Sequence, residues 1–223
     1  MSGGNEAERS THGWRRAAMA TAMVIATAGG LIAFHPGRRE VLPGHDAPSR
    51  IVIAPEGEPG QRLVIHGQVF APDGETAVEG VVLYVYNTGP DGRYAPPGKR
   101  VPRLRGWVRT GPEGRYEVET IRPGSYPGGR TAAHVHVFLW GAGYEPQWTG
   151  ELLFDDDPLV SDLEHQESRA AGRFGNVCTP EEQSDGQLSC VYDIRLKPEG
   201  DDFPSDLRHP FQSAGDGEAD DRG

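Results

Sequence analysis

Short apolar stretches separated by tight turns make up the middle of the chain. The stretches rich in branched and aromatic side chains are residues 63–70, 81–86, 106–109, 116–120, 133–139, 152–154 and 191–196. The last of these alternates apolar with polar residues, as a half-buried strand does. Turn residues are frequent and long apolar runs with a helical period are scarce. The pattern therefore predicts an all-β domain, an antiparallel β-sandwich with long loops.

The N-terminal end of the chain departs from this pattern. Arg15 and Arg16 precede an uncharged run of small and apolar residues, Ala17 to Phe34. The run has the length of an N-terminal hydrophobic helix, either a membrane anchor or the core of a signal peptide, with cationic residues on the inner side. Both alternatives predict export. The domain is then anchored to the membrane if the segment is uncleaved and secreted if it is cleaved.

Composition divides the chain into four parts. Residues 1–34 form the cytoplasmic tail and the signal or anchor segment, and residues 35–60, rich in Pro, Gly and charge, are predicted to be a linker. Residues 61–199 form the predicted β-sandwich, which is near the usual size of one domain. Residues 200–223 are an acidic tail, which we expect to be disordered and solvated.

Charge and cysteine content narrow the classes of partner. The net charge of -11 and pI near 5.2 argue against nucleic acid, which needs a basic surface. The two cysteines, Cys178 and Cys190, lie twelve residues apart, so they could form one loop-closing disulfide outside the cytoplasm or remain two unpaired buried thiols. They show no zinc-binding pattern, because no C-x-x-C or histidine pair accompanies them.

His134 and His136 form an H-x-H pair inside an apolar stretch. In a strand, a spacing of two places both imidazoles on the same face, so the pair could bind a metal, although histidines also occur on solvated edge strands. Tyr94 and Tyr126 follow glycine turns upstream, where a tyrosine is more often a packing residue than a ligand. Phenolate is a hard oxygen donor that suits Fe(III), whereas imidazole alone does not discriminate among zinc, copper and iron.

Several linked motifs resemble the intradiol ring-cleavage dioxygenases, the family of protocatechuate and catechol dioxygenases, over roughly residues 61–160. In chain order they are Gly92-Arg93-Tyr94, Arg105-Gly106, Glu113-Gly114-Arg115-Tyr116, Thr120-Ile121-Arg122-Pro123-Gly124-Ser125-Tyr126-Pro127, His134-Val135-His136 and Phe154-Asp155-Asp156-Asp157-Pro158. The resemblance implies a β-sandwich of that type. It also implies an Fe(III) cofactor with Tyr94 and His134 as equatorial ligands and Tyr126 and His136 as axial ligands.

The same resemblance implies that a catechol and dioxygen are the substrates and a muconate-type diacid is the product. Tyr126 would leave the metal and take a proton from the catechol, which makes it a catalytic residue as well as a ligand. The absence of flavin and nicotinamide motifs agrees with a reaction that needs no external reductant.

Two positions next to the ligands depart from the family pattern. Thr131 stands where the family usually has an arginine, which would offset the negative charge that develops on the substrate. Arg130, one residue earlier, could take this role if a bulge shifts the register. Glu151 stands where the family usually has a glutamine, which replaces a neutral amide with an anion. Both changes affect the groups that would polarise the substrate.

Three alternatives follow from these departures. The site could act on a substituted or polymer-derived catechol outside the cell, or the chain could be an exported catechol- or iron-binding module with little turnover. A zinc-dependent hydrolase is the weakest alternative because it leaves the tyrosines unexplained. The sequence does not specify the oligomeric state, and a homo-oligomer is one of the possible states.

Overall fold

The computed structural model describes residues 33–35, 38–40, 44–99 and 101–201. Its strands are β1 (Ala33–His35), β2 (Arg38–Glu40), β3 (Arg50–Val52), β4 (Arg62–Phe70), β5 (Val81–Asn87), β6 (Leu104–Arg109), β7 (Arg115–Ile121), β8 (His134–Gly141), β9 (Tyr144–Phe154), β10 (Val177–Cys178), β11 (Glu181–Glu182), β12 (Leu188–Val191) and β13 (Ile194–Arg195). The helices are the 3-10 turns η1 (Pro112–Gly114) and η2 (Gly172–Phe174) and the α-helix α1 (Asp162–Ala170).

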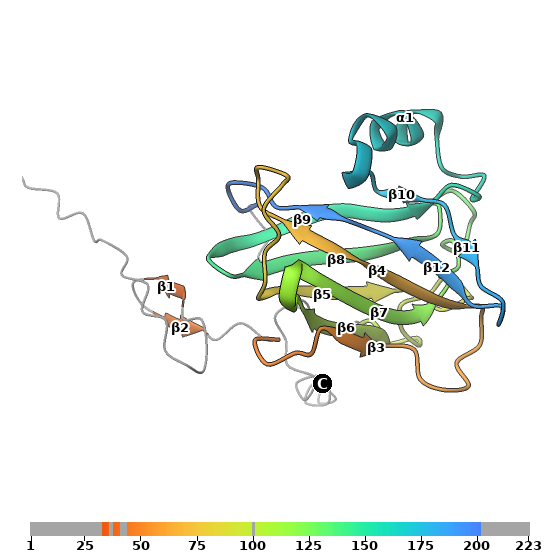
Figure 1. Cartoon of the computed structure of the whole chain (residues 1–223). Coiled ribbons are helices and arrows are strands. Elements are labelled where there is room, and N and C mark those ends of the chain that lie inside the picture. The colour runs from red at the N-terminus through yellow and green to blue at the C-terminus, as the bar shows by residue number, and fades with distance from the viewer. Residues whose placement is uncertain (1–32, 36–37, 41–43, 100, 202–223) are drawn as a thin grey trace, which may run out of the picture.

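Two sheets packed face to face form the domain (Figure 1). One has the strand order β10-β9-β8-β5-β6 and the other the order β11-β12-β4-β7-β3, with β13 also paired to β4. The predicted all-β sandwich is confirmed, but the pairing is not purely antiparallel. The pairs β10–β9, β12–β4, β13–β4 and β3–β7 are parallel. The strands β3, β10, β12 and β13 are short, and a long connection separates each of them from its parallel partner. Such connections are required because a two-residue hairpin can join only antiparallel strands.

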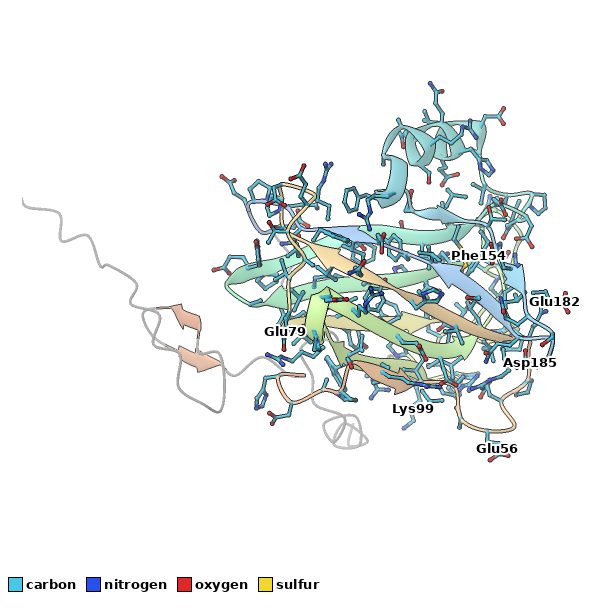
Figure 2. All side chains as sticks on the ribbon, viewed as in Figure 1. Glu56, Glu79, Lys99, Phe154, Glu182 and Asp185 are labelled. Atoms are coloured by element: carbon cyan, nitrogen blue, oxygen red, sulfur yellow. A yellow bond between two sulfur atoms is a disulfide. The ribbon has the colours of Figure 1, made fainter. Side chains whose placement is uncertain are left out.

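Alternation along the central strands β5 and β8 separates the core from an outer aromatic layer. Leu83 and Val85 of β5, with Val135 and Val137 of β8, pack inward in the main apolar cluster. Their neighbours, including Tyr84, Tyr86, Phe138 and Trp140, form a second cluster on the opposite face of the same sheet. Figure 2 shows Phe154 in the space between the sheets, whereas Glu182 and Asp185 project from the rim. The sheet that holds the histidine pair is therefore apolar on both faces, as a strand with uninterrupted burial requires.

Four strands, β3, β9, β12 and β13, differ from the sequence-based prediction. β9 begins at Tyr144, earlier than the predicted strand at residues 152–154. β3 lies within residues 35–60, where a linker was predicted, and pairs with β7, so these three residues belong to the sheet. The predicted strand at residues 191–196 is divided between β12 and β13. The division occurs because the Asp193 carboxylate accepts the Gln68 backbone N–H at 2.8 Å.

Helix α1 lies beyond β10 at one edge of the sandwich (Figure 1). The Ser161 hydroxyl accepts the Glu164 backbone N–H, and the Glu164 side chain accepts the Ser161 N–H at 2.7 Å, which completes a capping box. Such a cap typically contributes about 1 kcal/mol. The S-x-x-E spacing that begins at Ser161 is the local sequence signal for this helix start.

A disulfide joins Cys178 of β10 to Cys190 of β12 and so links the two sheets covalently. Both cysteines are buried in the main core cluster.

Replacing both cysteines with alanine is expected to lower the free energy of unfolding by about 2–3 kcal/mol, because the unfolded chain loses its cross-link. Denaturant unfolding of the double variant, and of the wild-type chain with and without reductant, measures this change. Equal stability of the oxidised and reduced wild-type chains would contradict it.

Among the residues that the structure describes, no helix is long and apolar enough to cross a bilayer. The predicted hydrophobic helix at residues 17–34 lies outside the described residues except for Ala33 and Phe34, which belong to β1. The acidic tail after residue 201 also lies outside them.

Candidate metal centre

Four side chains predicted as ligands converge on the outer face of the five-stranded sheet. His134 and His136 are the first and third residues of β8, and both point to this face. Tyr94 comes from the connection between β5 and β6, and Tyr126 from the connection between β7 and β8. The two histidines are buried, and the two tyrosines are half-buried.

The donor atoms of these four side chains lie close to one another. The Tyr94 Oη atom is 3.0 Å from His134 Nε2 and 2.5 Å from His136 Nε2. The Tyr126 Oη atom is 3.1 Å from His134 Nε2, and the two Nε2 atoms are 3.1 Å apart. The two tyrosine hydroxyls also contact each other. Spacings of about 3 Å are those of donors that share one small ion, with ligand bonds of roughly 2 Å.

Two glycines bring the tyrosine-bearing loops together. A Cβ atom on Gly92 would lie 1.9 Å from the Ser125 carbonyl oxygen, and one on Gly124 would lie 2.4 Å from the Pro90 carbonyl oxygen. The Gly124 N–H donates to the Gly89 carbonyl at 3.0 Å across the same contact. The backbones of the two loops therefore touch directly, which only glycine permits. Gly92 also has φ +74°, in the left-handed region.

Buried polar residues attach these loops to the sheet. The Thr120 hydroxyl donates to Asn87 Oδ1 at 2.8 Å, and the Thr88 hydroxyl donates to the Gly124 carbonyl at 2.8 Å. Asn87, Thr88 and Thr120 are almost completely buried. Because a buried polar group must find a partner, this network fixes where the loops leave β5 and β7.

Asp157 holds the start of β8 in place. Its carboxylate accepts the Ala133 N–H at 2.7 Å and the Leu159 N–H at 2.9 Å. Asp157 is buried, and Ala133 directly precedes His134. Charged acceptors make the stronger hydrogen bonds, so this clamp orients His134, the first of the two predicted ligand histidines. The motif Phe154 to Pro158 was noted in the sequence, but its positioning role became visible only in the structure.

The histidine tautomer suits a metal ligand. The His134 Nδ1–H donates to the Ala132 carbonyl at 2.7 Å. A carbonyl only accepts, so the proton lies on Nδ1 and the Nε2 lone pair faces the donor cluster.

Aromatic rings surround the second histidine. Tyr86 stacks on His136 with ring centroids 4.4 Å apart and an angle of 16° between the planes, and Trp148 lies 5.1 Å from the same ring. These contacts restrict rotation of the His136 imidazole and exclude water beside it. Sequence reasoning missed both residues, although Tyr86 lies directly opposite His136 in the ladder.

The environment opposes ionisation of the tyrosines in the absence of a cation. Burial raises the pKa of Tyr94, and its hydrogen bond with Tyr126 raises this pKa further. Burial also raises the pKa of Tyr126, although the bond with Tyr94 lowers it. Both side chains therefore remain phenols until positive charge is placed among them, since burial penalises the phenolate. A bound cation would supply that charge.

The donor set fits a ferric ion. Two phenol oxygens become hard anionic donors once ionised, and two imidazole nitrogens complete the set, a combination that suits Fe(III). Within the described part of the chain there is no group of three or more His, Cys, Asp and Glu residues close enough to hold a metal. Among the described residues, the two histidines therefore form a candidate metal centre only together with Tyr94 and Tyr126.

The remaining predicted site residues lie around this cluster. Arg130 and Thr131 are exposed in the loop before β8. Arg130 makes no hydrogen bond or ion pair with any described residue. The irregularities in the β8–β9 ladder come after His136, so no bulge there turns Arg130 toward the ligands. Glu151 lies opposite His136, with its Oε1 atom 3.9 Å from His136 Nδ1.

The chain is similar in sequence to known dioxygenases. A family described as Dioxygenase matches residues 44–198. Catechol 1,2-dioxygenase 1 from Acinetobacter lwoffii is 35% identical over 138 residues, which are 53% of this chain and 43% of that protein. The protocatechuate 3,4-dioxygenase beta chain from Burkholderia cepacia is 31% identical over 118 residues, 47% of this chain and 50% of that protein. The chain thus spans half or less of the length of these relatives.

A solved structure shares the fold. The dioxygenase domain of a dioxygenase carbohydrate-binding protein fusion from Streptomyces sp. SirexAA-E superposes with a TM-score of 0.53. The match covers 75% of this chain and 97% of that domain, at 23% sequence identity.

Proposed function

Since this chain belongs to the intradiol ring-cleavage dioxygenase family, we propose that it is a non-haem Fe(III) enzyme. Its reaction is the cleavage of a catechol-type ring between the two hydroxyls by dioxygen. The product is a muconate-type diacid that contains both atoms of dioxygen. The observation that supports this best is the convergence of Tyr94, Tyr126, His134 and His136 on one point.

The four converging residues would hold the metal. His134 and His136 would bind through Nε2, and Tyr94 and Tyr126 through their phenol oxygens. When bound, Fe(III) would supply a Lewis-acidic centre that the two catechol oxygens chelate and that makes the ring reactive toward dioxygen without an external reductant. Asp157 and Tyr86 keep the two imidazoles in position, as partners of metal ligands generally do.

Tyr126 is the residue that would receive a substrate proton. Its hydroxyl contacts Tyr94 and His134, whereas the Tyr94 hydroxyl contacts all three other donors. Tyr126 can therefore leave the cluster with the loss of fewer contacts. As a phenolate, the form that a bound cation would favour, Tyr126 would accept the proton of a catechol hydroxyl at Oη and become a neutral phenol.

Oxygen uptake tests the proposal. The iron-loaded protein is expected to consume one dioxygen for each catechol and to release a muconate, identified by its mass and absorbance. The same protein loaded with zinc should consume none, because the ring would not be activated. Binding of catechol to the iron-loaded protein without oxygen uptake would contradict the proposal.

We propose export of the domain as well. The disulfide between Cys178 and Cys190 supports it, because such bonds persist mainly outside the cytoplasm. Catechol and dioxygen are then met outside the cytoplasm, and the N-terminal segment would tether the domain to the membrane if it is not cleaved. Fractionation of cells that make the full chain tests this proposal.

A further inference from the structure

Glu151 places a carboxylate beside the candidate metal centre. It is directly opposite His136 in the β8–β9 ladder, so both side chains lie on the outer face of the sheet. The Oε1 atom is 3.9 Å from His136 Nδ1, which is ion-pair range but longer than a hydrogen bond. The Glu151 side chain is 44% exposed and that of His136 is 10% exposed. The carboxylate therefore lies between the buried ligands and solvent.

The charge of Glu151 reaches the ligand tyrosines. Burial is the main cause of the raised pKa values of Tyr94 and Tyr126, but the Glu151 carboxylate raises both further. It acts in the same direction on Tyr86. Because Glu151 lies opposite His136 on the same face of the sheet, 3.9 Å from its ring, its charge also acts on whatever binds among these side chains, since charges within about 8 Å are little screened at physiological salt.

The arginines of the surrounding loops and of β6 do not pair with this carboxylate. Arg122 forms a two-pronged ion pair with Asp156, at 2.7 and 2.5 Å. Arg103 pairs with Glu58, and Arg105 donates to the Pro102 carbonyl at 2.6 Å. No lysine or arginine among the described residues pairs with Glu151. Arg130 is the remaining cation near Tyr126 in the sequence, and it is exposed to solvent.

We propose that Glu151 selects substrates by their charge. The site accepts catechols whose ring substituents are neutral or cationic and rejects catechols that bear a carboxylate. The inference rests on the proposed function, because it names the substrate class of that site. A carboxylate on the ring would meet the Glu151 anion, which no lysine or arginine of the described residues neutralises, in a half-buried position where like charges repel strongly. An ammonium group would be attracted by the same anion.

Three catechols that differ in charge test the proposal. Catechol, 3,4-dihydroxybenzoate and 4-(2-aminoethyl)catechol are titrated into the iron-loaded protein without oxygen, with binding followed by visible absorption, and kcat/KM is then measured with oxygen. Glu151→Gln is expected to raise both affinity and kcat/KM for the carboxylate about tenfold relative to catechol. It should lower those for the cationic compound several-fold.

Two variants serve as controls. Glu145→Gln removes the same charge from the same strand at an exposed position, and it should leave the three affinities in their original ratio. Arg130→Gln tests whether the exposed arginine attracts carboxylates instead. A wild-type preference for 3,4-dihydroxybenzoate that disappears in Arg130→Gln would overturn the proposal, as would unchanged ratios in Glu151→Gln.

The two levels of the proposal fail differently. Oxygen uptake with all three catechols at equal efficiency would overturn charge selection and leave the dioxygenase assignment intact. Charge-ordered binding without oxygen uptake would overturn the assignment and leave charge selection intact. A protein that binds none of the three compounds would overturn both.

Discussion

Replacing Tyr94 with phenylalanine is expected to lower kcat/KM for catechol by more than about 100-fold and to weaken iron binding. Loss of a group that merely supports a metal ligand typically costs 10–100-fold, and Tyr94 is itself a proposed ligand. Its hydroxyl contacts each of the other three donors, as His134 Nε2 also does. Oxygen uptake, iron content and the visible absorption of the loaded protein measure the effect.

Tyr144→Phe is the matched control for this substitution. Tyr144 is a half-buried tyrosine at the opposite end of β9 from Glu151, and its hydroxyl makes no hydrogen bond to any described residue. This variant should retain iron, colour and activity. A Tyr94→Phe protein that kept its visible absorption and its turnover would remove Tyr94 from the metal centre. Loss of colour only when both Tyr94 and Tyr126 are replaced would show that either phenolate suffices for absorption.

Gly92→Ala is expected to disrupt the candidate metal centre although Gly92 is not one of its proposed ligands. An alanine Cβ would lie 1.9 Å from the Ser125 carbonyl oxygen, so the two tyrosine loops would have to separate. The left-handed backbone at φ +74° adds about 1–2 kcal/mol for a non-glycine residue. We expect the free energy of unfolding to fall by more than about 2 kcal/mol. We also expect most iron binding to be lost, because Tyr94 and Tyr126 would no longer meet.

Gly98→Ala separates the effect of backbone strain from the effect of the clash between the two loops at Gly92. Gly98 lies in the same loop with φ +82°, and a Cβ there would meet nothing within 4 Å. Its replacement should cost about 1 kcal/mol of stability and leave iron binding intact. Denaturant unfolding and iron titration of both variants separate the two effects. Equal losses of iron affinity in Gly92→Ala and Gly98→Ala would show that the loop contact does not hold the site together.

Local patterns determined a large part of the fold in advance. Alternation and turn residues located β4, β5, β6, β7 and β8 to within two residues at each end. They were less successful for β9, because its first half carries Pro146 and polar residues that do not resemble a strand. The break between β12 and β13 was missed because it depends on Asp193, whose carboxylate replaces a backbone acceptor for a strand distant in sequence.

The candidate site divides in the same way. His134 and His136 could be placed on one face of a strand because the side-chain period of two is a local property. Which face that would be, the core or the outer aromatic layer, depended on the packing of the two sheets. Arg130 could be given a role from its sequence neighbourhood, but only the fold shows that it faces solvent.

The sequence by itself therefore determined strands β4 to β8, the histidine pair and the order of motifs that resembles the dioxygenases. The tertiary structure decided how residues far apart in the chain meet. Tyr94 and Tyr126, separated by 32 residues, come together because Gly92 and Gly124 let two loop backbones touch. Glu151 faces His136 because of the register of β8 and β9. These are non-local contacts set by backbone packing, and no spacing along one strand or turn encodes them.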